Sequence, residues 1–547
     1  MSYTLLKNIG LDPCITWTVE DYIQVGVELG SDKNRIQQLK QQVADSRRFS
    51  ILWHSCEFAR QLEAAFLHMA AAKPADQFQF LAINQQASTA EWNQLGFNTI
   101  VAMDLSDSAL VKRRGWERAQ SYWRQGLSLD PIHIGCWLNY LHSHYVLGDR
   151  ERAFGEALHL FNYLLSVNPE TYSCDVETTL THLSWPEQPD HPGQGSNHDQ
   201  ILYCVVRWIA QYGGVIYRPE ILRFWKLALD LHDRDIEARM IVSLNYLAEG
   251  YPEGLVYLRQ VPTETASYTR AAIAEQIFSN QIDLYSSTAP PIYSTDYCGY
   301  KLAVEPNLHS ITTLVLLAQG EWFEDEIQFF HQFLKPDMNV IDVGANIGIY
   351  SLLCASLVTD TGRVFAVEPT PSCVNLLEST LSLNPGLDRI LKIYPNAAAD
   401  QAGSAYLELH TSSVFNRILN KSEIETNSTE STLREVEIIT LDQLWLSEGS
   451  LPIHLLKIDA EGAEIQVLKG AKKLIQNCHP VILFENLHGA LDTGSKSACY
   501  LEEFDYSFYA YLPLISGLKR VSPQQMKTLN TIALSQKTLD QMQASIT

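Results

Sequence analysis

The stretch that decides the fold of the C-terminal region reads MNVIDVGANIGIYSLL, at residues 338–353. It opens with an apolar run that contains one acid, Asp342, and it passes through a Gly-x-x-x-Gly turn into a second apolar run. Gly344 permits a sharp turn at the end of a buried strand, and Gly348 lets the next helix begin close to a ligand. The pattern predicts a strand, a turn and a helix of a parallel α/β sheet. Taken alone, it fits a nucleotide site and a structural turn equally well.

A second predicted strand, RVFAVEP at residues 363–369, also ends in an acid. Glu368 lies one crossover helix after Gly344, where an acid can accept both hydroxyls of an adenosine ribose. Asn346 stands where a dinucleotide-binding turn needs glycine to approach a pyrophosphate. S-adenosylmethionine (SAM) carries no phosphate, and Asp342, Asn346 and backbone amides can serve its amino and carboxylate groups. The turn therefore favours SAM over NAD as the ligand.

The third predicted strand, LKIYPNAA at residues 391–398, ends at the rim where an adenine would lie. Two interpretations of Asn396 stay open: its side chain bonds the adenine edge, or it caps the strand.

The most informative stretch is HLLKIDAEGAEIQVLKGA, at residues 454–471. Its strand carries Lys457 and Asp459 on one side, two residues apart. Glu461 and Glu464 follow at a predicted helix start, where the helix dipole alone accounts for acids. The helix dipole does not explain why Lys457 and Asp459 stand in an otherwise apolar strand. At the carboxyl end of a doubly wound sheet such a pair faces the ligand crevice. A fifth strand, PVILFEN at 480–486, again ends in an acid.

Together these residues resemble the FkbM-type methyltransferase family, from about residue 320 to about residue 488. Five segments carry the resemblance: DVGANIG (342–348), EP (368–369), TLD (440–442), KIDAEGAE (457–464) and VLKGA (467–471). Ala460 replaces a usual valine, which we regard as harmless. The resemblance implies a Rossmann-like class I SAM fold for residues 300–547, with a β insertion within 400–445. It also implies methyl transfer to a hydroxyl on a sugar, polyketide or peptide-derived molecule.

These observations define a candidate site. We hypothesise that Asp459 is the base or the acceptor-orienting group, with Lys457 and Glu461 as its neighbours. The residues expected to bind SAM are Asp342, Gly344, Asn346, Gly348, Glu368 and Asn396. No metal is expected, although carboxylates that hold a divalent cation to acidify the hydroxyl stay open as the alternative.

The region before the methyltransferase pattern is predicted to be all-α. Residues 137–169 read as a helix, a tight turn at Gly148 and a second helix, and residues 224–247 read as a degenerate further pair. Residues 76–290 thus resemble tetratricopeptide repeats, with an irregular helical domain as the alternative. Residues 1–75 resemble the tail of the SPINDLY-type O-GlcNAc transferase catalytic domain. That resemblance implies a docking piece or relic, not a glycosyltransferase.

Bulk properties limit the classes of function. A chain of 547 residues predicts two to four domains. The net charge of −23 argues against general nucleic-acid binding. None of the ten cysteines forms a C-x-x-C pair, so no structural zinc or dithiol site is indicated. No apolar run is long enough to cross a bilayer, and the N-terminus lacks signal-peptide features, so we expect a cytoplasmic protein.

The sequence therefore predicts a SAM-dependent O-methyltransferase that acts on a hydroxyl of a sugar, glycan or secondary metabolite. The helical region is expected to recruit a large acceptor or a protein partner. The alternative is a SAM-binding helical-repeat scaffold without turnover. The identity of the acceptor does not follow from the sequence, because acceptor pockets are built from variable loops.

Overall fold

The computed structural model describes residues 88–104, 108–131, 133–167, 197–213, 219–282, 291–409, 417–419, 432–486, 493–523 and 529–539. The chain divides into two compact units, Met1–Ala87 and Ser88–Thr547, and all described residues belong to the second. The segment that resembles an O-GlcNAc transferase tail, residues 1–75, lies outside the described residues.

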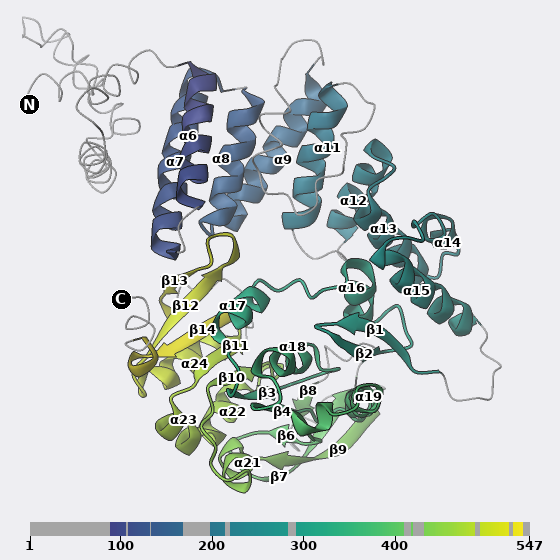
Figure 1. Cartoon of the computed structure of the whole chain (residues 1–547), viewed down its shortest axis with the longest axis vertical. Coiled ribbons are helices and arrows are strands. Elements are labelled where there is room, and N and C mark those ends of the chain that lie inside the picture. Colours follow the sequence, from purple (N-terminus) through teal and green to yellow (C-terminus); the bar gives the residue numbers. More distant parts are fainter. Residues whose placement is uncertain are drawn as a thin grey trace, which may run out of the picture. The chain divides into compact units, whose positions relative to one another are not determined.

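The described residues between 88 and 282 are helical (Figure 1). Their helices are α6 (Thr89–Asp104), α7 (Ala109–Leu129), α8 (Ile134–Val146), α9 (Arg150–Ser166), α11 (Asn197–Tyr212), α12 (Pro219–Leu231), α13 (Ile236–Ala248), α14 (Gly254–Leu258) and α15 (Ala266–Ile282). The predicted helix, turn and helix are confirmed in α8 and α9. Gly148 adopts the left-handed conformation between them (φ +79°), and Asp149 caps α9 by accepting the Arg152 N–H. The resemblance to tetratricopeptide repeats stays a prediction.

A short connection leads from the helices to the C-terminal sheet. It consists of the antiparallel hairpin β1 (Tyr293–Tyr297) and β2 (Tyr300–Val304), followed by α16 (Ile311–Gln319) and α17 (Glu326–Phe333). Gly320 ends α16 in a left-handed conformation, and the chain then enters the segment before α17 that reaches the candidate site.

The C-terminal region is built on an eight-stranded sheet of order β13-β12-β14-β11-β10-β3-β4-β5. The strands are β3 (Asn339–Val343), β4 (Arg363–Val367), β5 (Leu391–Tyr394), β10 (Leu455–Ile458), β11 (Val481–Glu485), β12 (Tyr506–Leu512), β13 (Gly517–Val521) and β14 (Asn530–Ser535). From β5 to β11 neighbouring strands are parallel, whereas β14 runs antiparallel to both β11 and β12. The order of the strands reverses between β3 and β10. In a doubly wound sheet the ligand crevice lies at such a switch point, outside the carboxyl ends of the strands.

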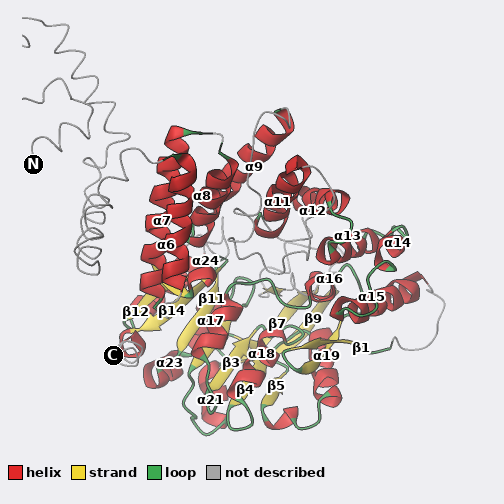
Figure 2. Ribbon diagram, turned by 45° about the horizontal axis from the view of Figure 1, so that its top comes forward, coloured by secondary structure: helices red, strands yellow, loops and turns green. Residues whose placement is uncertain are grey.

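Helices pack on both faces of this sheet (Figure 2). They are α18 (Ile349–Val358), α19 (Pro371–Leu383), α21 (Leu441–Ser447), α22 (Glu464–Gly470), α23 (Lys472–Cys478) and α24 (Thr493–Glu502), with short 3-10 turns at Leu387–Arg389 and Pro513–Ile515. Neighbouring residues of β3 belong to two separate hydrophobic cores: Val340 shares one with Leu352 of α18, and Ile341 shares the other with Val467 of α22. Burial on both faces explains why Val340, Ile341 and Val343 of β3 are all apolar rather than alternating with polar residues. The predicted Rossmann-like α/β fold is confirmed.

A second, four-stranded sheet follows β5. Its order is β6-β9-β7-β8, with β6 (Ala397–Ala398), β7 (Gly403–Leu409), β8 (Arg417–Leu419) and β9 (Thr432–Ile439). β7 and β9 pair antiparallel. This sheet is the β insertion predicted within residues 400–445.

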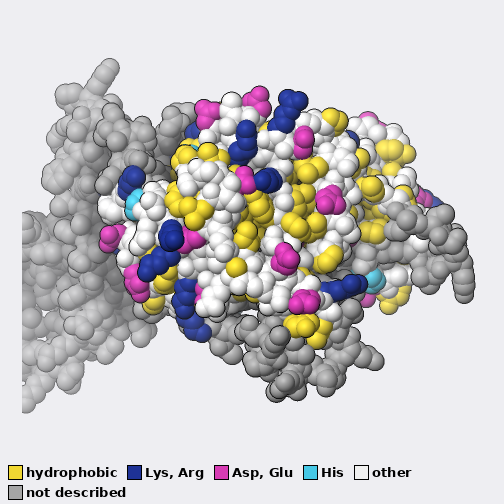
Figure 3. Space-filling view, turned by 90° about the horizontal axis from the view of Figure 1, so that it is seen from below, with side chains coloured by type: hydrophobic (Ala, Val, Ile, Leu, Met, Phe, Trp, Pro, Cys, Tyr) yellow, Lys and Arg dark blue, Asp and Glu magenta, His cyan; other side chains and the backbone are white. Residues whose placement is uncertain are grey.

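On the face seen in Figure 3, acidic and basic side chains are interspersed among hydrophobic ones. Every helix in the described part of the chain is too short or too polar to span a membrane.

Candidate functional site

The turn after β3 brings the backbones of two strands together. Gly344 has φ +71°, and a Cβ built on it would lie 1.7 Å from the carbonyl oxygen of Asp459. The Gly344 N–H donates to the Val367 carbonyl at 2.9 Å, and the Asp459 N–H donates to the Val343 carbonyl at 3.1 Å. Glycine is therefore required at position 344 by conformation and by space. The turn, the end of β4 and the end of β10 meet at this residue.

Glu368 is tied to the same turn. Its Oε2 accepts the backbone N–H of Asn346 and its Oε1 accepts that of Thr370, both at 2.8 Å. The side chain is buried, and this burial raises the pKa of Glu368. Asn346 has φ +50°, and its own Oδ1 accepts the Ile347 N–H. The Thr370 side chain is a third hydrogen-bond partner of Glu368. A carboxylate can accept about four hydrogen bonds, so Glu368 has the capacity for a further donor such as a ribose hydroxyl.

Gly348 and Asn396 complete the set of residues expected to bind a nucleoside. Gly348 has φ +102° and is the N-cap residue directly before α18, and a Cβ there would approach Leu377 Cδ2 to 2.6 Å. Asn396 is half-buried in the short step between β5 and β6, and its N–H donates to the Tyr394 carbonyl. The structure thus places Asn396 at the third strand, as the sequence predicted, and both interpretations of its side chain stay open.

Lys457 is buried between two acids. The register of β10 on β3 sets Lys457 opposite Asp342. Its Nζ lies 3.7 Å from Asp342 Oδ1 and 3.1 Å from Asp459 Oδ2. Burial lowers the pKa of Lys457, but the carboxylates of Asp459 and Asp342 outweigh it and raise the pKa overall. Asp342 is wholly buried and also accepts the Ser351 hydroxyl at 2.6 Å. Asp342 therefore contacts the Lys457 ammonium from the buried side, whereas the Asp459 side chain is partly exposed.

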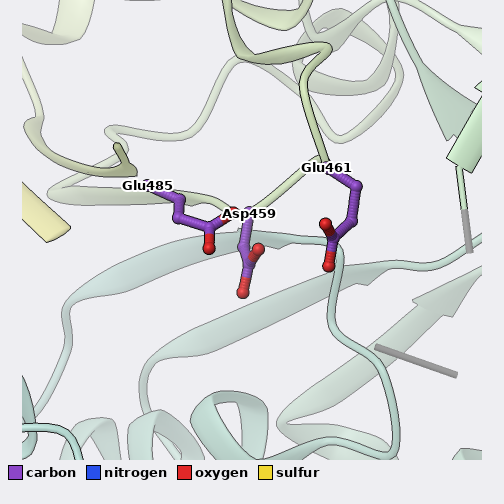
Figure 4. A group of neighbouring side chains, drawn as sticks. All are labelled: Asp459, Glu461 and Glu485. Carbon is purple, nitrogen blue, oxygen red and sulfur yellow. The ribbon is translucent and has the colours of Figure 1, made fainter. Parts of the chain in front are cut away.

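Three carboxyl groups gather at the carboxyl ends of β10 and β11. Asp459, Glu461 and Glu485 each offer an oxygen, and these oxygens lie within 4.8 Å of one another (Figure 4). Burial, together with Asp459 and Glu464, raises the pKa of Glu461 to about 8. Burial and Asp459 also raise the pKa of Glu485. Of the described residues, these three have the spacing to hold a divalent cation.

Glu464 differs from this trio. Its Oε1 accepts the N–H groups of Ala460 and Gly462, at 3.2 and 3.0 Å. Glu464 thus closes the turn that leads into α22, in keeping with the predicted electrostatics of a helix start.

Two residues that reach the site were not identified from the sequence. Glu324 lies in the segment between α16 and α17, and Asn530 begins β14. The Tyr350 hydroxyl and the Asn530 side-chain amide both donate to Glu324 Oε2, at 2.6 and 2.7 Å. Glu324 belongs to the stretch GEWFE at residues 320–324, where the resemblance to the FkbM-type family begins, but none of the five segments that carry the resemblance includes it.

Residues 342–508 match the family model of the methyltransferase FkbM domain. The C-terminal region carries an FkbM methyltransferase domain. All motifs that predicted this family, from the glycine turn to the stretch after β10, fall inside the matched residues. The FkbM domain belongs to the SAM-dependent methyltransferases. Glu324 and Asn530 contribute to the site from outside the matched range.

Two named methyltransferases are similar to the FkbM domain. The hexuronic acid methyltransferase AglP of Haloferax volcanii is 25% identical over 170 residues, which cover 31% of this chain and 64% of the relative. The methyltransferase sdnD of Sordaria araneosa is 27% identical over 157 residues, covering 24% of this chain and 59% of the relative. The chain spans about three fifths of the length of each of these relatives.

Solved structures of methyltransferases are also similar to this chain. The FkbM methyltransferase of Methylobacillus flagellatus aligns with a TM-score of 0.25 and 15% identity, over 48% of this chain and 60% of that chain. An O-methyltransferase of Bacillus cereus, in complex with SAH, aligns with a TM-score of 0.24 and 12% identity, over 53% of this chain and 100% of that chain.

Proposed function

We propose that the FkbM domain transfers the methyl group of SAM to a hydroxyl group of a sugar, glycan or secondary metabolite. The observation that carries this proposal is the Lys457–Asp459 pair, at 3.1 Å, beside the glycine turn and across the switch point from Glu368. The pair lies where an acceptor would approach a SAM molecule whose ribose is bound by Glu368. The AglP relative, a hexuronic acid methyltransferase by name, supports a sugar acceptor.

In this proposal residues at the carboxyl ends of β3, β4 and β5 would hold SAM. Glu368 would accept the ribose hydroxyls, and Asn396 would donate to or accept from the adenine edge if it does not only cap its strand. Gly344 and Gly348 leave room for the cofactor, while Asn346 and the buried Asp342 shape the turn near its amino acid end.

Asp459 and Lys457 then orient and deprotonate the acceptor hydroxyl. SAM supplies an activated methyl group when it is bound. Asp459 accepts a hydrogen bond from the acceptor hydroxyl and takes its proton as the oxygen–carbon bond forms and the sulfur–carbon bond breaks. Lys457 holds the Asp459 carboxylate in place and stabilises its charge. Positioning of this kind can supply several kcal/mol of the barrier reduction.

Glycan analysis tests this proposal. A strain without the gene should lack a methyl ether in its extracellular polysaccharide or glycans, and mass spectrometry of the hydrolysed material should detect the loss. Restoring the gene should restore the ether, whereas a gene that encodes Asp459→Asn should not. Identical methylation in all four strains would count against the proposal.

The alternative is a SAM-binding scaffold without turnover. It predicts SAM binding in the purified protein, together with an unchanged glycan methylation pattern in the deletion strain. A protein partner on the helical region, and a cytoplasmic location, stay predictions.

A further inference from the structure

Glu324 approaches the site from outside the sheet, on the segment that links α16 to α17. Its carboxylate accepts three hydrogen bonds. The Trp322 indole N–H donates to Oε1 at 2.9 Å, and the Tyr350 hydroxyl and the Asn530 amide donate to Oε2. Burial raises the pKa of Glu324, while its bond with Tyr350 lowers it. A half-buried acid with this many donors is held in one orientation.

Tyr350 connects this carboxylate to the reacting centre. It is the second residue of α18, the helix that begins at the glycine turn, and its side chain is buried. The Lys457 Nζ lies over the Tyr350 ring, 4.8 Å from its centroid, which is cation–π range. Phe330 of α17 packs beside the same ring, with centroids 5.1 Å apart. The hydrogen bond from the Tyr350 hydroxyl to Glu324 therefore fixes the orientation of a ring that contacts the Lys457 ammonium.

An unbroken series of side-chain contacts links Glu324 to Asp459. Glu324 binds the Tyr350 hydroxyl, the Tyr350 ring lies against the Lys457 ammonium, and Lys457 binds Asp459. Asp342 and Asp459 hold the ammonium from two directions, and Tyr350 adds a third. If the ring turned, Lys457 could shift towards Asp342 and leave Asp459 without its partner.

We propose that Glu324 is a positioning residue for methyl transfer, acting through Tyr350 and Lys457 on the orientation of the Asp459 carboxylate. This inference rests on the proposed function. Glu324 makes no contact with the reacting atoms in this account. Its role is to hold the ring on which the Lys457–Asp459 pair depends. A displacement of reacting groups by about 1 Å can lower a rate about 100-fold.

The test compares Glu324→Gln, Tyr350→Phe and their double variant with wild type. The matched control is Glu378→Gln, an exposed glutamate on α19. Transfer of a tritiated methyl group from SAM is measured on the glycan fraction of the deletion strain. SAM titration by calorimetry counts the cofactor-competent sites, so each rate is expressed per SAM-binding site rather than per total protein.

We expect each single variant to lower kcat per SAM-binding site by about 10- to 100-fold. The Kd for SAM should stay within about twofold, and the double variant should be no slower than the slower single one, because both changes break one linkage. Glu378→Gln should match wild type. A merely structural role would reduce the number of SAM-binding sites and leave the rate per site unchanged.

Two results would overturn the inference while leaving the proposed function intact. One is wild-type turnover per site in Glu324→Gln. The other is a double variant whose loss equals the product of the single losses, since that shows independent roles. If wild type and the control bind SAM but transfer no methyl group, the proposed function fails and the inference fails with it.

Discussion

Lys457 Nζ lies 3.1 Å from Asp459 Oδ2 and 3.7 Å from Asp342 Oδ1, so one buried ammonium holds an acid of the crevice and an acid of the core. The two acids differ in what they face: Asp342 is wholly buried, whereas the Asp459 side chain is 37% exposed. Of these two acids, only Asp459 has a side chain exposed enough to contact an acceptor. This asymmetry supports our proposal that Asp459 carries the chemistry and that Asp342 stabilises Lys457.

Because Asp342 is buried beside Lys457, we expect removal of the Lys457 ammonium to lower the free energy of unfolding strongly. Lys457→Met leaves Asp342 buried without its charged partner, and breaking a buried pair in this way costs about 3–5 kcal/mol. Urea denaturation should show this loss, and adding Asp342→Asn should recover much of it. The matched control is Lys392→Met, which removes an exposed ion pair with Glu448 and should cost about 1 kcal/mol or less. Equal losses in the two lysine variants would contradict the account.

The glycine turn predicts a strict requirement at one position. Gly344→Ala would place a Cβ against the Asp459 carbonyl oxygen, so the ends of β3 and β10 must separate. We expect SAM binding to be abolished. Gly386→Ala is the control, because Gly386 also has a positive φ, of +93°, but has no atom within 4 Å of the added Cβ. It should cost only about 1 kcal/mol of stability and leave SAM binding intact. Calorimetric titration of both variants measures the difference.

The crowded carboxyl groups predict a pH dependence of stability. Glu461, with its pKa raised to about 8, binds a proton in the folded state that the unfolded state releases near pH 4.5. Stability from this group is present below pH 4.5 and is lost as the pH rises to about 8. Glu461→Gln should therefore melt at the same temperature as wild type at pH 4.5 and about 2 °C or more above it at pH 9. A melting temperature for Glu461→Gln that is not above wild type at pH 9 would show that Glu461 is ionised without penalty.

The same groups bear on the question of a metal. Lys457 already compensates Asp459, and the raised pKa keeps Glu461 largely protonated at pH 7. A cation bound to Asp459, Glu461 and Glu485 would have to displace both the Lys457 ammonium from Asp459 and the proton from Glu461. We expect methyl transfer at pH 7 to survive EDTA. Loss of activity that Mg²⁺ restores would instead support the carboxylate-bound metal.

Local patterns were enough to predict the five parallel strands β3, β4, β5, β10 and β11 of the C-terminal sheet. The runs that became β3, β4, β10 and β11 are each apolar and each carry an acid at or near their end, which is visible in a single stretch of sequence. The alternation in β10 placed Lys457 and Asp459 on one side, and their 3.1 Å contact agrees with it. The glycine turn was likewise readable, because its φ values demand the residues that stand there.

Contacts between neighbouring strands of the sheet could not be predicted from the sequence in the same way. Lys457 meets Asp342 because of the register between β10 and β3, which are more than 100 residues apart in the chain. Glu485 was seen only as a strand-end acid, and its place beside Asp459 depends on β11 lying next to β10. Glu324 and Asn530 come from outside the sequence motifs altogether. Such contacts follow from packing, which a local pattern does not encode.

SAM binding is tested most directly by two calorimetric titrations of the full chain, one with SAM and one with UDP-N-acetylglucosamine. We predict one SAM site per chain, retained in Asp459→Asn and lost in Gly344→Ala, with no binding of the sugar nucleotide. Absence of SAM binding to the wild-type chain, or binding of UDP-N-acetylglucosamine in its place, would contradict this prediction.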